Sequence, residues 1–245
     1  MTLTSQQPLL RRPLESRRAV WIELLVVFVV VVAPLIFSSN VYFFEARRSD
    51  PAHGFVLQSI YRLVQAAGTV ALILFVIHKS GRSRRRFGIF RVRIFRDTLA
   101  GFALFVGSMI AYYLLWYVAW AVMQSTAGSS PARADTSMIS GPASRWQFLL
   151  LIAMSFANGA AEEISMRAYL ITRLEELLGT RPALILSMLA FASYHTYQGV
   201  TGALSAALIG TIYGLYFLRF RRLWPLILAH CIQDIISIAM VSGRG

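Results

Sequence analysis

Residues 146–167 decide which fold this chain can adopt, and they read Trp-Gln-Phe-Leu-Leu-Leu-Ile-Ala-Met-Ser-Phe-Ala-Asn-Gly-Ala-Ala-Glu-Glu-Ile-Ser-Met-Arg. The stretch is apolar enough to cross a bilayer, yet it contains Glu162, Glu163 and Arg167. Each ionisable residue at the centre of a spanning helix costs roughly 2.5–3.5 kcal/mol, so three unpaired groups would cost on the order of 10 kcal/mol. Groups that are kept at such a cost predict a functional site inside a bundle of helices.

Composition places the chain in a membrane. Hydrophobic residues make up 57% of the sequence, charged residues make up 14%, and the mean hydropathy is +0.60, whereas soluble domains are about 45–50% apolar. Cys231 is the only cysteine, so the chain forms no intramolecular disulfide. The first apolar run contains Glu23 and lacks a cleavage pattern, so we expect a retained helix in a mature protein that begins close to Met1. We predict an all-α polytopic membrane protein.

Seven apolar runs are long enough to cross about 30 Å of hydrocarbon. They lie near residues 20–39, 55–78, 97–124, 146–172, 182–197, 200–218 and 223–242. The second run is the weakest, because Gln58, Arg62 and Gln65 interrupt it. We expect a basic cytoplasmic tail over 1–18 and a single membrane domain over 19–242, with the chemistry in 146–242.

The distribution of positive charge predicts the orientation of the spans, because basic loops stay in the cytoplasm. Seventeen of the 24 lysines and arginines fall on one side if the spans alternate. This side contains the N-terminal tail, the loop Lys79–Arg96, Arg173, Arg181 and the arginines at 219, 221 and 222. The chain is therefore expected to have its N-terminus inside and its C-terminus outside.

The net charge of +13 and the pI near 10.8 do not indicate a nucleic-acid partner. The basic residues lie beside the spans, where they set topology and contact anionic lipid headgroups. The segment Arg84–Arg96 mixes arginines with bulky apolar residues, which is typical of an interfacial anchor. The partners expected are the lipid bilayer and a membrane-associated peptide or protein substrate, with no nucleic acid.

Three segments bring acids and bases to membrane depth. Glu163 and Arg167 are four residues apart, so we expect them to form a buried ion pair. Glu162 points about 100° away on an α-helix and is free for another partner. His195 and the pair His230 and Asp234 occur in later apolar segments. We expect the three segments to direct these groups toward one place.

Such a set of groups is suited to amide hydrolysis. A carboxylate in a low-dielectric cavity can act as a general base on water near neutral pH, and an imidazole can orient that water or stabilise an oxyanion. Glu162, His195 and His230 are equally a plausible zinc site, in which the metal would activate the water. The sequence does not separate the two mechanisms. Cys231 lies beside His230 but on another face, so we do not expect a thiol nucleophile.

The motifs resemble those of the CPBP intramembrane endopeptidases, the group of CAAX proteases and bacteriocin-processing or immunity proteins also called Abi. The resemblance covers about 146–242 and comprises three motifs in order. They are Glu162-Glu163-x-x-x-Arg167, Phe191-x-x-x-His195 and His230-x-x-x-Asp234. It implies hydrolysis of a peptide bond at the membrane.

The resemblance also implies a role for each residue. Glu162 would activate the attacking water and His195 would share it, while His230 and the residue four positions later would stabilise the oxyanion. Glu163 and Arg167 would shape the site through their ion pair. The chain departs from the family's frequent Asn at Asp234, and an ionised Asp cannot donate to an oxyanion.

Two other functions stay open. One is a catalytically silent immunity or scaffold protein of the same fold, and the other is a proton-coupled transporter, since Glu and His chains in spans also relay protons. No inverted repeat supports the transporter. We expect a bacterial inner-membrane protein. The substrate, whether the substrate is lipidated, the oligomeric state and the pathway do not follow from the sequence.

Overall fold

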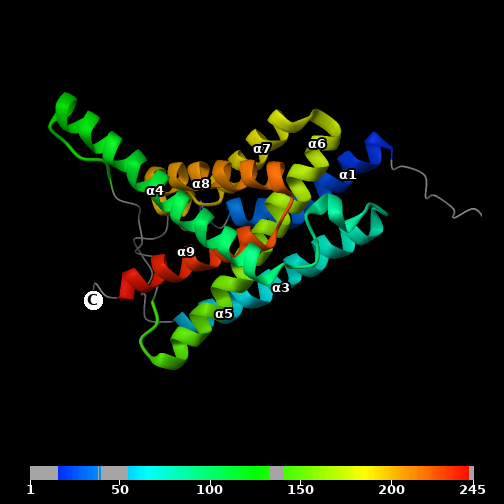
Figure 1. The fold of residues 1–245 in the computed structure, drawn as a ribbon, viewed down its shortest axis with the longest axis horizontal. Helices are drawn as coiled ribbons and strands as arrows, with labels where there is room; N and C mark the ends of the chain where they lie inside the picture. The colour runs from blue at the N-terminus through cyan, green and yellow to red at the C-terminus, as the bar shows by residue number, and fades with distance from the viewer. Residues whose placement is uncertain (1–15, 38, 40–54, 133–140, 243–245) are drawn as a thin grey trace, which may run out of the picture.

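The computed structural model describes residues 16–37, 39, 55–132 and 141–242 (Figure 1). These residues are helical apart from the connections between helices. The longer helices are α1 (Arg17–Val27), α3 (Phe55–Lys79), α4 (Ile94–Ala127), α5 (Arg145–Glu162), α7 (Thr180–Ser193), α8 (Gly199–Phe220) and α9 (Trp224–Ser242). Shorter elements are the π-helices η1 (Phe28–Val32) and η4 (Glu163–Ile171), the 3-10 helices η3 (Arg84–Phe87) and η5 (Thr196–Gln198), and α6 (Thr172–Leu178).

The prediction of an all-α polytopic membrane protein is confirmed. Five continuous helical stretches in the described part of the chain are long and apolar enough to span a membrane. They are Arg17–Phe37, Phe55–Lys79, Ile94–Ala127, Arg145–Leu178 and Thr196–Phe220. Two further apolar helices, Thr180–Ser193 and Trp224–Met240, are shorter. Most of the predicted tail, residues 1–15, lies outside the described residues.

One predicted span differs from the structure. The run 182–197 was expected to cross the membrane as a helix, but α7 ends at Ser193 after 14 residues. At 1.5 Å per residue, such a helix extends about 21 Å, less than the roughly 30 Å of hydrocarbon. Beyond it, the chain forms a turn and the 3-10 helix η5. His195 therefore lies in a turn within the membrane domain instead of on a helix.

Helix packing is closest where glycine lets two backbones approach. The pairs with the most extensive contact are α4 with α9, α7 with α8, α3 with α5, and α5 with α9, and Figure 1 shows α5 beside α3. A Cβ on Gly159 of α5 would lie 3.3 Å from the His230 Cβ of α9. A Cβ on Gly210 of α8 would lie 3.2 Å from Phe191 Cδ1 of α7. Small residues therefore set the spacing of three helices that bear the predicted motifs.

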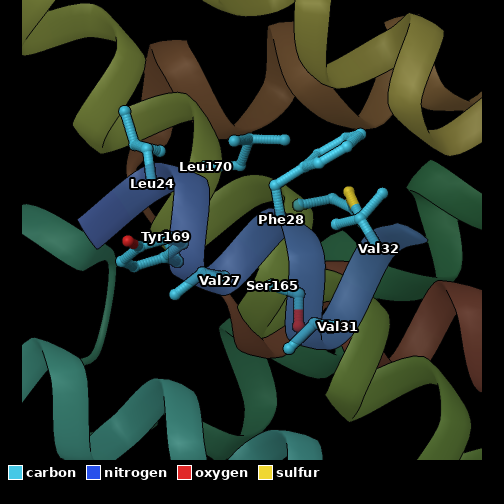
Figure 2. A pocket seen from close by; sticks show the side chains of 9 residues that line it. Leu24, Val27, Phe28, Val31, Val32, Ser165, Tyr169 and Leu170 are labelled. Carbon is cyan, nitrogen blue, oxygen red and sulfur yellow. The ribbon is translucent and has the colours of Figure 1, made fainter. Parts of the chain in front are cut away.

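An ionic cluster attaches the first helix to the segment around η4. The side chain of Arg173 is fully buried, and its Nε and NH2 atoms each donate to a carboxylate oxygen of Glu23 at 2.8 Å. Tyr169 donates to the same carboxylate at 2.9 Å, and Arg173 also pairs with Glu176 at 3.1 Å. Figure 2 shows the apolar side chains of the first helix, among them Phe28, lying along this segment. The α1 helix is thus held against the element that contains Glu163.

Candidate active site

The centre of the site is the imidazole of His230, which contacts carboxylates at both ring nitrogens. Its Nδ1 lies 2.8 Å from Glu163 Oε1, and its Nε2 lies 3.4 Å from Glu162 Oε2. Asp234, one turn further along α9, has its Oδ1 3.7 Å from the same Nε2. Arg167 NH1 lies 3.0 Å from Glu163 Oε1, so the ion pair expected from the four-residue spacing is present. The structure thus brings five of the six predicted site residues into direct contact.

A change of helix type occurs at the two glutamates. The α-helix α5 ends at Glu162, and the nine-residue π-helix η4 begins at Glu163. A π-helix is rare, usually a single turn, and frequent at functional sites. It changes the angle between successive side chains from that of an α-helix. The sequence-based angle of about 100° between Glu162 and Glu163 therefore does not apply to the chain beyond Glu162.

Burial divides the site into an inner and an outer part. The side chains of Glu163 and Arg167 are 0% and 1% exposed, whereas those of Glu162 and Asp234 are 15% and 23% exposed. A substrate or water molecule would therefore approach from the side of Glu162 and Asp234. The inner pair is enclosed by protein and can act only through its neighbours.

Proton count limits the states that this cluster can adopt. A carboxylate only accepts hydrogen bonds, and each nitrogen of His230 faces a carboxylate oxygen. Both contacts are favourable only if the imidazole bears two protons or if a carboxyl group bears one. The cluster therefore holds one proton beyond that of a neutral imidazole, shared between His230 and the carboxylates that flank it. Such a proton is what general acid–base catalysis requires.

Aromatic rings enclose the guanidinium of Arg167. Its Cζ lies 4.3 Å from the centroid of the Phe191 ring and 5.7 Å from that of Tyr213. Cation–π contacts of this kind compensate part of the cost of removing the charge from water. Gly210 leaves space for the Phe191 ring, since an added Cβ would lie 3.2 Å from Phe191 Cδ1 and 3.6 Å from Arg167 NH2. Phe191 of the second motif thus has a packing role for Arg167.

His195 is oriented by the backbone of the preceding turn. Its Nδ1 lies 2.8 Å from the carbonyl oxygen of Phe191. A carbonyl only accepts, so Nδ1 bears the proton and Nε2 of the neutral ring is an acceptor. The ring centroid lies 4.7 Å from that of Tyr194 and 6.2 Å from that of Tyr197. Within the part of the chain that the structure describes, no direct bond joins His195 to Glu162, so a shared water molecule would have to connect them.

Asn158 joins α5 to the last of the predicted site residues. It precedes Glu162 by one turn, and its Nδ2 donates to Asp234 Oδ2 at 3.0 Å. Asp234 is therefore an acceptor toward α5. The hydroxyl of Tyr194, also unpredicted, interacts electrostatically with Glu162. Only the proximity of Tyr194 to His195 in the sequence could have indicated this.

The alternative metal site requires Glu162, His195 and His230 to converge on one point. Among residues 16–37, 39, 55–132 and 141–242, no three His, Cys, Asp or Glu side chains converge in a way that could hold a metal ion. His195 Nε2 is available as a ligand, but the His230 nitrogens are both directed at carboxylates. The arrangement present thus does not fit the set Glu162, His195 and His230 as ligands. No step below involves a metal.

The fold and site together define a polytopic helical membrane protein with a carboxylate–imidazole centre buried in the helix bundle. Comparison with known families is more specific. Residues 144–236 match the family model described as type II CAAX prenyl endopeptidase Rce1-like. This region contains the three motifs, and the resemblance to the CPBP endopeptidases is confirmed. This match supports the class of intramembrane endopeptidases and does not specify the catalytic mechanism. No curated protein and no solved structure matches the chain.

Proposed function

We propose that this protein is an intramembrane endopeptidase in which Glu162 activates a water molecule for attack on a peptide bond. The observation that supports the proposal most directly is the contact of His230 with both Glu162 and Glu163 inside an apolar bundle. A base and a proton donor lie 3.4 Å apart on the less buried side of this cluster. General-base hydrolysis of an amide needs these two groups.

The reaction proceeds in two steps. Glu162 takes a proton from water, and the resulting hydroxide attacks the carbonyl carbon of the scissile bond. His195, whose Nε2 is an acceptor, orients that water through its second hydrogen. The tetrahedral intermediate collapses when the C–N bond breaks, and the proton on Glu162 passes to the leaving amine. The products are a carboxylic acid and an amine, which become a carboxylate and an ammonium group when the acid proton is transferred, and Glu162 is ionised again.

The remaining residues stabilise charge. His230 bears a proton on Nε2 in one of the two states of the cluster, so it can donate to the oxyanion. Glu163 accepts from Nδ1 at 2.8 Å, which fixes the orientation of the ring and favours its cationic form. Arg167 NH1 in turn pairs with Glu163 Oε1 at 3.0 Å. The inner ion pair therefore acts on the reaction only through His230.

The proposal extends to the substrate, the membrane and the orientation of the protein in that membrane. The substrate is a membrane-associated peptide or protein, and the membrane is the bacterial inner membrane with the N-terminus inside. The exposed residues Ile94 and Phe95 follow a run of arginines, which suits contact with anionic lipid headgroups. A phosphatase fusion at Gly245 is expected to be active and one at Ser83 inactive. The opposite pattern would reverse the proposed orientation.

The experiment that tests the function is cleavage by the purified protein in detergent. Two internally quenched peptides serve as probes, one farnesylated near a free C-terminus and one without the lipid. Trapping with Glu162→Gln, followed by mass spectrometry, identifies cellular substrates. Cleavage of either probe or of a trapped substrate by the wild type is expected. A catalytically silent protein would cleave none of them.

A further inference from the structure

The hydroxyl of Tyr194 is a buried polar group that the reaction described above does not use. Tyr194 is 5% exposed and follows the last residue of α7. Its hydroxyl oxygen has no hydrogen-bond partner among the residues that the structure describes. A buried donor without an acceptor is costly, commonly by about 1–3 kcal/mol. A group retained at that cost needs an explanation.

The ring of Tyr194 is held firmly in place. It packs edge-on against Phe191, with the centroids 5.3 Å apart and the planes at 75°. Its other neighbour is the ring of His195, with a centroid distance of 4.7 Å. Phe191 is itself packed against Arg167, so Tyr194 is a layer of the same stack. Its hydroxyl is therefore directed by packing and not by a hydrogen bond.

The hydroxyl faces the proposed base. Glu162 is the strongest electrostatic partner of Tyr194, ahead of Arg167 and Glu163. Oxygen Oε2 of Glu162 is itself buried and has no hydrogen bond within the described residues, its contact with His230 Nε2 being 3.4 Å. A buried donor and a buried acceptor that interact electrostatically are thus both without a hydrogen-bond partner within the described residues.

We propose that Tyr194 is a positioning residue that donates a hydrogen bond to the Glu162 carboxylate and holds this carboxylate toward the attacking water. The hydroxyl fixes the carboxylate from the α7 side while His230 faces it from the α9 side. This hydrogen bond forms when the base is ionised and substrate excludes water from the site. This inference rests on the proposed function of Glu162.

The test compares Tyr194→Phe with Tyr197→Phe on the two quenched peptides. Tyr197 also lies against His195, but its hydroxyl accepts from Gln198 at 2.8 Å. Loss of a group that orients a catalytic residue costs about 10–100-fold. Tyr194→Phe is therefore expected to lower kcat about 10–100-fold with KM unchanged within about threefold, while Tyr197→Phe retains kcat. Incorporation of 4-aminophenylalanine at position 194, which keeps a donor, should restore most of the rate.

Two measurements separate positioning from a structural role. Because the removed hydroxyl has no partner, Tyr194→Phe should melt in detergent at the temperature of the wild type or higher. The Glu162→Asp variant has a shorter side chain, so its carboxylate is withdrawn from the Tyr194 hydroxyl. Adding Tyr194→Phe to this variant should therefore change the residual rate by less than about threefold.

Several results would overturn the inference. They are an unchanged kcat in Tyr194→Phe, a lower melting temperature or a failure to fold, and an undiminished effect in the Glu162→Asp background. If Tyr194→Phe is fully active and Glu162→Gln is inactive, only the role of Tyr194 fails. If Glu162→Gln itself retains the wild-type rate, the proposed function fails as well.

Discussion

Gly159 offers the most quantitative test of how the site is assembled, because its lack of a side chain allows α5 and α9 to approach closely. A Cβ at this position would lie 3.3 Å from His230 Cβ and 3.4 Å from both Cys231 N and Ile227 O of α9. Gly159→Ala requires a shift of a few tenths of an ångström, which would lengthen the 2.8 Å contact between His230 and Glu163 only slightly. We expect it to lower kcat by less than about tenfold.

Gly159→Val adds two methyl groups against the backbone of α9 and should displace this helix by about 1 Å. A misplacement of about 1 Å can cost 10²-fold in rate, which is about 2.7 kcal/mol of the barrier. Since the tetrahedral intermediate depends on His230, kcat should fall about 100-fold while the protein still inserts in the membrane.

The control for this series is Gly68, a glycine of α3 at which an added Cβ would meet nothing within 4 Å. Gly68→Val should leave kcat within about twofold of the wild type. Cleavage of the quenched peptides and the melting temperature in detergent are measured for all three variants. A wild-type kcat in Gly159→Val would refute the reasoning, because the contact of α5 with α9 would then not position His230.

Two further predictions concern single side chains. His195→Ala should lower kcat at least about 100-fold with insertion unaffected, since it removes the acceptor that orients the water, and retained activity would remove His195 from the mechanism. Asp234→Asn should keep the rate within about threefold, because an amide oxygen can still accept from Asn158 Nδ2, which donates at 3.0 Å to Asp234. A loss of 10–100-fold, as for a group that supports a metal ligand, would contradict this, as would inactivation by chelator and rescue by zinc.

The sequence predicted the spans well where hydropathy decides. The expected run 55–78 is the helix Phe55–Lys79, and the run 97–124 lies within Ile94–Ala127. The contact of Glu163 with Arg167 also follows from spacing, since residues four apart remain neighbours. These features depend on local patterns and on the bilayer thickness.

Other features depend on tertiary packing and could not be predicted. Residues 194–199, Tyr-His-Thr-Tyr-Gln-Gly, are more polar than α7, but this change alone does not specify that the helix stops at Ser193 and leaves His195 in a turn. The π-helix beginning at Glu163 has no local signature in the sequence. The hydrogen bond of Asn158 with Asp234 joins residues of two helices whose register the sequence does not specify. The expectation that the three segments meet at one place came from the cost of isolated ionisable groups in apolar helices and from the family resemblance, and not from any local pattern.

In the proposed function, Glu162 is the base that activates water without a metal ion. The measurement that tests it most directly is the kcat of purified Glu162→Gln on the quenched peptides, beside the wild type with and without chelator. We expect the kcat of Glu162→Gln to be at least about 100-fold lower than that of the wild type, the lower end for loss of a general base. We also expect an unchanged melting temperature in the variant and no effect of chelator on the wild type. A Glu162→Gln variant that cleaves at the wild-type rate would contradict it.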